Sequence, residues 1–160
     1  MSEIEEIVKE LESKFGAEVK KQRDKRHWVK INRENLIDVC TWLKEKGFDH
    51  LSSVVGVDYP ENFEVVYHLW SYSLKELISL KVPVPKDDPK IQSVTSIWGG
   101  ANWHERETAE MFGITFEGHP DPRKLLLPDD FEGYPLRKDF KLKPTHWLGK
   151  EEEEEKDVQA

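Results

Sequence analysis

The chain has 160 residues, of which 37% are hydrophobic and 35% are charged, and its formal net charge is −8. The last ten residues set Glu151 to Glu155 and Asp157 against Lys156, so they carry −5 and the rest of the chain carries −3. This balance argues against a free-standing nucleic-acid binder, which needs a basic patch. The single cysteine, Cys40, excludes internal disulfides, a four-cysteine zinc site and a self-contained iron–sulfur cluster.

The start of the chain has neither the basic nor the apolar region of a signal peptide. No apolar run approaches the ~20 residues that a bilayer-spanning helix requires. The length is typical of one domain with a tail or two. We therefore expect a soluble cytoplasmic protein that reaches a membrane only through partners.

Two helices are predicted in the first 47 residues. Ser2 and Glu5 form a capping box, and a helix over residues 3–15 follows from apolar side chains at helical spacing: Ile4, Ile7, Val8, Leu11 and Phe15. Asn32 is placed to cap the second helix, and Gly47 to end it. The apolar stripe of that second helix consists of Leu36, Val39, Cys40 and Leu43.

Between these helices, β-compatible runs at 17–21 and 28–32 predict a hairpin. The basic segment 20–26 lies at its turn. We interpret this segment as a solvated hairpin turn rather than a nucleic-acid site, because it lacks an aromatic platform.

The middle of the chain predicts a sheet. Strands are expected at 50–59 and 63–72, and the second of these is apolar on both faces, as in a sheet interior. Residues 78–84 alternate between apolar and polar and include a proline, which predicts a half-buried strand near an edge. Residues 86–89 are expected to form a loop.

A short helix is predicted over residues 103–112, capped by Asn102 and ended by Gly113. One of its faces carries Trp103, Arg106, Glu107 and Glu110. Arg106 and Glu110 are expected to form an i,i+4 ion pair. This face is either a partner-facing or internally braced charge cluster, or an ordinary solvated helix face; the large apolar area nearby favours the first.

No catalytic, cofactor or metal site is predicted. Residues 113–118 have the glycine spacing of a phosphate loop, but His119 and Pro120 stand where Lys and Ser or Thr are needed. Glu105 and Glu107 diverge by about 200° on a helix and are not a matched acid–base pair. His104 and His119 have no third metal ligand at suitable spacing. A stand-alone enzyme using His104, Glu107 or His119 for acid–base chemistry stays as the alternative hypothesis.

Prolines at 120, 122, 128 and 135 favour extended or turn geometry over 119–140. Such a segment could lie along a partner, or fold back on its own domain as an Ω-like loop, and both alternatives stay open. If it lies along a partner, these residues are expected to make contacts: Arg106, Glu107, Glu110, His119, Arg123, Tyr134, Arg137, Lys138 and Asp139.

The expected organisation is an α+β domain over 1–97, with N-terminal helices packed in two layers on a mixed or antiparallel sheet. The short helix and an extended partner-binding arm, residues 98–149, belong to the same domain. Residues 150–160 are expected to form a disordered acidic tail.

Residues 98–140 carry a recognisable series of motifs: Trp-His-Glu-Arg-Glu at 103–107 with Glu-Met-Phe-Gly at 110–113, Gly-His-Pro at 118–120, and Gly-Tyr-Pro-Leu-Arg-Lys-Asp at 133–139. This series resembles the signature of the 30 kDa subunit family of respiratory complex I, the NADH-quinone oxidoreductase. The family pattern usually has Asp at the position of Glu110. The resemblance implies a peripheral-arm subunit with no redox centre of its own.

The same resemblance implies that the chain packs against a large catalytic subunit of the complex I 49 kDa or [NiFe]-hydrogenase type. Iron–sulfur subunits of the same complex are expected beside it, and any iron–sulfur, NiFe, quinone or NADH chemistry is expected in those partners. The expected location is the cytoplasmic side of a membrane, reached through the complex. The Lys- and Glu-rich composition favours an archaeal membrane-bound hydrogenase or a sulfur-reducing relative.

Overall fold

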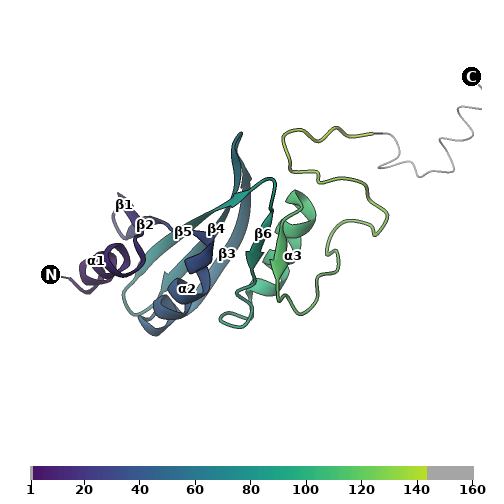
Figure 1. Ribbon diagram of the computed structural model, residues 1–160. Helices are drawn as coiled ribbons and strands as arrows, with labels where there is room; N and C mark the ends of the chain where they lie inside the picture. Colours follow the sequence, from purple (N-terminus) through teal and green to yellow (C-terminus); the bar gives the residue numbers. More distant parts are fainter. Residues whose placement is uncertain (1, 144–160) are drawn as a thin grey trace, which may run out of the picture.

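The computed structural model describes residues 2–143, and Figure 1 shows how its elements are arranged. A five-stranded mixed sheet has the order β1-β2-β5-β4-β3. Its strands are β1 (Glu18–Arg23), β2 (Arg26–Lys30), β3 (His50–Asp58), β4 (Asn62–Ser71) and β5 (Glu76–Pro85). All neighbours are antiparallel except β2 and β5, which are parallel. The expected α+β fold class is confirmed.

Helices α1 (Glu3–Phe15) and α2 (Leu36–Glu45) cover one face of this sheet. The predicted bounds of the first helix are confirmed, and the Ser2 N–H donates to Glu5 Oε2 at 2.9 Å. The predicted cap of the second helix is wrong in detail, because Asn32 precedes a 3₁₀ turn, η1 (Arg33–Asn35), and makes no side-chain capping bond. Inward-facing residues of both helices and all five strands share one apolar core.

The prediction that residues 78–84 lie near an edge is wrong. β5 lies in the middle of the sheet, between β2 and β4. Its polar residues alternate because they point to the sheet face that no described helix covers. Pro83 is tolerated because β2 ends at Lys30. The Ile31 N–H donates to the Lys81 carbonyl on the β2 side, and two residues later no β2 residue remains to need the missing proline N–H.

Helix α3 (Ala101–Phe112) lies against β3 and is followed by β7 (Thr115–Glu117). A two-stranded parallel sheet, which the sequence did not predict, joins β7 to β6 (Lys90–Gln92). The helix begins two residues earlier than predicted. Gly100, not Asn102, precedes its first turn, and the fully buried Ala101 belongs to the core.

Gly56 on β3 allows the close approach of α3. A Cβ atom at this position would lie 2.6 Å from Phe112 Cδ2 and 3.1 Å from Thr108 Cγ2. The Phe112 ring also meets Phe63 of β4, with 6.3 Å between the ring centroids. The helix is therefore seated directly on the strand backbone, and this seating places everything that follows α3. The predicted acidic tail, residues 150–160, lies outside the described residues.

The substitution Gly56→Ala tests this packing. The added methyl group cannot fit without displacing Phe112, so the free energy of unfolding should fall by about 1–3 kcal/mol. Gly99→Ala is the matched control, because a Cβ there meets no atom within 4 Å. Urea unfolding of both variants is the measurement, and an equal effect of the two would contradict the close approach.

Candidate functional site

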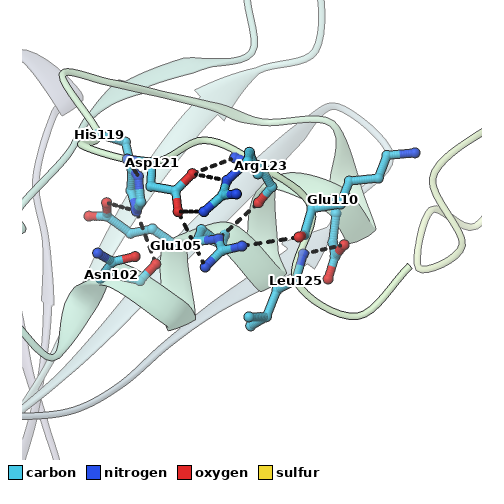
Figure 2. A network of polar contacts seen from close by, with 9 residues as sticks. Asn102, Glu105, Glu110, His119, Asp121, Arg123 and Leu125 are labelled. Carbon is cyan, nitrogen blue, oxygen red and sulfur yellow. Dashed lines mark hydrogen bonds and ion pairs between the residues drawn. The ribbon is translucent and has the colours of Figure 1, made fainter. Parts of the chain in front are cut away.

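The candidate site is the contact between α3 and the segment that follows β7. We call residues 119–143 the arm; Figure 1 shows it folded back beside α3 at one end of the molecule. The polar side chains of α3 reach the arm through main-chain groups as well as side chains (Figure 2). The contact runs from a buried end, at Glu105, to an exposed one.

Glu105 is fully buried, and its carboxylate joins α3 to the turn after β6. Oε1 accepts from the Val94 N–H at 2.7 Å, and Oε2 accepts from the Ser93 hydroxyl at 2.6 Å. Burial raises the pKa of this carboxyl, although the two hydrogen bonds and the nearby His119 oppose that shift. Glu105 therefore anchors α3, which the sequence did not predict.

His119 fastens the start of the arm. Its side chain is 3% exposed, and Nδ1 accepts from the Asp121 N–H at 3.0 Å. In the neutral ring Nε2 then carries the proton, which it donates to the Asn102 carbonyl at 3.0 Å. Nε2 also lies 3.9 Å from Glu105 Oε2, so the histidine connects arm and helix (Figure 2).

Arg106 holds the next stretch of the arm by its carbonyl groups. Nε donates to the Arg123 carbonyl at 2.8 Å, and Nη2 donates to the Lys124 carbonyl at 3.0 Å. Asp121 lies 3.8 Å from Arg106 and makes two 2.8 Å bonds to the Arg123 guanidinium. These contacts, led by the Arg123 hydrogen bonds, lower the pKa of the Asp121 carboxyl.

Glu110 binds the three amide groups that follow. Its carboxylate accepts from the N–H groups of Leu125, Leu126 and Leu127 at 3.1, 2.9 and 3.2 Å. Successive main-chain N–H groups that converge in this way form an anion-binding concavity. The predicted ion pair between Arg106 and Glu110 is not formed among the described residues, because each group bonds to the arm backbone instead. We call Arg106 and Glu110 together the α3 clamp.

A second attachment lies at the C-terminal end of α3. Arg137 Nε donates to the Phe112 carbonyl at 2.5 Å, and the Leu136 N–H donates to the Met111 carbonyl at 3.1 Å. Helix ends leave such carbonyls without intrahelical partners. The Arg137 guanidinium also stacks on Tyr134, 4.5 Å from the ring centroid. The arm thus completes the helix.

Gly113 and Asp58 make room for this second attachment. Gly113 has φ 73°, and a Cβ there would lie 2.7 Å from the Tyr134 ring. The Lys138 N–H donates to Asp58 Oδ2 at 2.9 Å, and Lys86 Nζ lies 2.7 Å from Oδ1. The Lys86 hydrogen bond is the main reason why the pKa of the Asp58 carboxyl is lowered.

The structure brings most of the predicted partner-binding residues together, but it engages several of them inside the chain. Glu110 and the side chains of Arg106 and His119 are mostly buried, and Arg137 is stacked. The Arg123 side chain is 81% exposed and Asp139 is exposed. Partner contact by any of the nine stays a prediction. Sequence reasoning missed Glu105 and Asp58, which bond at long range and leave no local pattern.

Between the two attachments the arm closes on Lys124. Its ammonium donates to the carbonyl groups of Pro128, Asp129 and Phe131 at 3.3, 3.4 and 3.0 Å. This local closure agrees with the Ω-like alternative for the described part of the arm. A cleft of about 260 Å³ remains between arm and helix, with apolar walls from Ala109, Ile114, Phe116 and Pro122.

The enzyme alternative gains no support from this geometry. Among residues 2–143 no hydrogen bond or ion pair joins His104, Glu107 and His119 to one another. In the same part of the chain, no cluster of three His, Cys, Asp or Glu side chains is suited to hold a metal ion. Nor does any helix within residues 2–143 have the length and apolar character needed to span a membrane.

Comparison with known proteins agrees with the motif resemblance. The family model described as "Respiratory-chain NADH dehydrogenase, 30 Kd subunit" matches residues 29–146. The chain belongs to this family. The match begins within β2 and runs through α3 and the arm, so it covers both attachments.

Relatives of the 30 kDa family include NADH-quinone oxidoreductase subunit 5 of Thermus thermophilus, 43% identical over 136 residues, or 78% of this chain and 66% of that protein. A subunit of the F(420)H(2) dehydrogenase of Methanosarcina mazei is 46% identical over 119 residues, which cover 72% of this chain and 75% of that one. A chain in the structure of the membrane-bound sulfane sulfur reductase, an archaeal respiratory membrane complex, superposes with a TM-score of 0.79. It is 31% identical, with 88% of this chain and 87% of that chain covered.

Replacing Glu110 by Ala tests the α3 clamp. The three leucine amides would lose their shared acceptor, at about 1–3 kcal/mol, so their hydrogen exchange should accelerate about tenfold or more. Glu107→Ala is the control, because Glu107 lies on the same helix and makes no hydrogen bond to the arm within residues 2–143. Exchange measured residue by residue contradicts the clamp if both variants behave alike.

Titration of Glu105 tests its burial. Because folding raises its pKa above the ordinary 4.5, the folded state binds this proton more tightly than the unfolded state. Its contribution to stability therefore declines as pH rises from 4.5 through the folded pKa. Carboxyl carbon NMR should give a midpoint above 4.5, and Glu105→Gln should remove this part of the pH dependence. A midpoint at or below 4.5 would show that the carboxylate is not desolvated.

Proposed function

We propose that the chain is a non-catalytic subunit that packs against the large catalytic subunit of a membrane-bound oxidoreductase related to complex I. The observation that carries this proposal is an arm that is bonded to its own domain yet leaves apolar side chains outside. Leu126, Leu136 and Leu142 are 62%, 55% and 61% exposed. Family membership and the names of the relatives support the class of complex.

Pre-organisation explains how the two halves of this observation fit together. The amide of Leu126 is held by Glu110 and the amide of Leu136 is held by α3, so both side chains are presented from a fixed backbone. A segment that is already ordered loses little conformational entropy on docking. Apolar anchors in fixed positions are typical of the residues that dominate interface energetics.

In this proposal the α3 clamp and Arg137 position the arm, and the exposed leucines meet the partner. The electron-transfer groups, whether iron–sulfur, NiFe, quinone or NADH sites, belong to partner subunits, as does any ion translocation. The chain then reaches the cytoplasmic side of the membrane through the complex. Relatives in NADH, F420H2 and sulfur-reducing systems support a shared structural role across different electron donors.

Leu126→Ser and Leu136→Ser test the proposal directly. Each variant should fold normally, because the side chain already lies in solvent, but should bind the large catalytic subunit about tenfold or more weakly. Tyr72→Ser is the matched control, since Tyr72 is 63% exposed at a turn outside the arm. Co-purification and titration with the large subunit are the measurements. Unchanged binding of both leucine variants, or failure of the unaltered chain to bind, would refute the proposed role.

A further inference from the structure

The other face of the sheet, at the end of the molecule away from the arm, carries a basic cluster. Side chains at alternate positions of β2 share this face, and they are Arg26, Trp28 and Lys30. Cross-strand pairing puts Lys81 opposite Lys30, and Ser79 opposite both Trp28 and His68. We call Arg26, Trp28, Lys30, His68 and Lys81 the basic sheet face. Figure 1 shows β1 and β2 far from α3 and the arm.

The three permanent cations of this face lack acidic partners. Arg26, Lys30 and Lys81 form no ion pair with a carboxylate among residues 2–143, whereas the neighbouring Lys20 pairs with Glu18 at 3.4 Å. The whole chain has 32 acidic and 24 basic residues. In such a chain an acid-free group of three cations runs against the overall charge balance.

An exposed aromatic ring lies at the centre of the cluster. Trp28 is 37% exposed, and the Lys81 ammonium lies 3.7 Å from its ring centroid. This cation–π contact holds the charge over the ring without a carboxylate. Segment 20–26 contains no aromatic platform of its own, but the fold supplies one from the adjoining strand.

His68 reports on the charge at this face. Its Nδ1 lies 2.9 Å from the Ser79 hydroxyl, and the ring is half-buried. Burial is the first cause that lowers the pKa of His68, and the positive charges of Arg26 and Lys81 follow. An anion bound beside these two cations would remove part of that repulsion.

We propose that the basic sheet face is a second interaction surface, which binds an extended acidic segment of a partner protein. Arg26 and Lys30 lie four residues apart along β2, or ~13 Å at strand spacing. Carboxylates at positions i and i+4 of an extended chain have the same separation, and the residue between them would lie on Trp28. Three cations are few for a nucleic-acid track, and the −8 net charge disfavours a polyanion at long range. This surface is independent of the arm.

Titration of the full chain with a hexaglutamate peptide tests the inference at low ionic strength. The indole signal of Trp28 should shift on binding, and the pKa of His68 should rise toward its ordinary value. The double variant Lys30→Glu/Lys81→Glu should bind the peptide about tenfold or more weakly. Lys141→Glu/Lys143→Glu, the control, makes the same charge change on the arm and should bind like the unaltered chain.

Two further probes identify the class of partner. A single-stranded DNA oligonucleotide and vesicles containing phosphatidylglycerol are compared with the peptide at equal salt. The inference is overturned if either probe binds more tightly than hexaglutamate in a way that Lys30→Glu/Lys81→Glu abolishes. It is also overturned if hexaglutamate does not bind, or if the two double variants weaken its binding equally.

Discussion

The bonds between the Glu110 carboxylate and three consecutive amides of the arm are the contact on which the candidate site depends. A segment with four prolines cannot satisfy its own amides in a helix, so an external acceptor must hold them. One turn earlier, Arg106 supplies donors to carbonyl groups of the same segment. Two opposite charges on one helix thus bind the two kinds of main-chain group. The backbone is fixed and the leucine side chains are left outside.

The clamp works only because α3 is itself held. Gly56 lets the helix sit on β3, and Glu105 ties it to the turn after β6. The second attachment at Arg137 uses carbonyl groups that any helix leaves unpaired at its C-terminus. Core packing, helix position, arm conformation and exposed apolar surface therefore form one causal series. A defect in the seating of α3 should be felt at the arm, although no arm residue has changed.

Much of the fold followed from local patterns, and the part that did not has physical causes. Helical spacing located α1, and turn residues located the β1–β2 hairpin. The position of β5 was misread because alternation marks an uncovered sheet face as readily as a sheet edge. Arg106 and Glu110 were recognised as important, but their i,i+4 spacing suggested a mutual pair. Their real partners are backbone groups 15 to 18 residues away, for which a sequence has no signature.

Hydrogen exchange of the free chain and of its complex with the large catalytic subunit tests the central claim most directly. If the arm is pre-organised, the amides of Leu125, Leu126 and Leu127 are already protected in the free chain. Binding should then add little protection to them, while the exposed leucine methyl groups lose contact with solvent. Amides that exchange freely in the isolated chain and become protected only in the complex would contradict the account, because the partner would then order the arm.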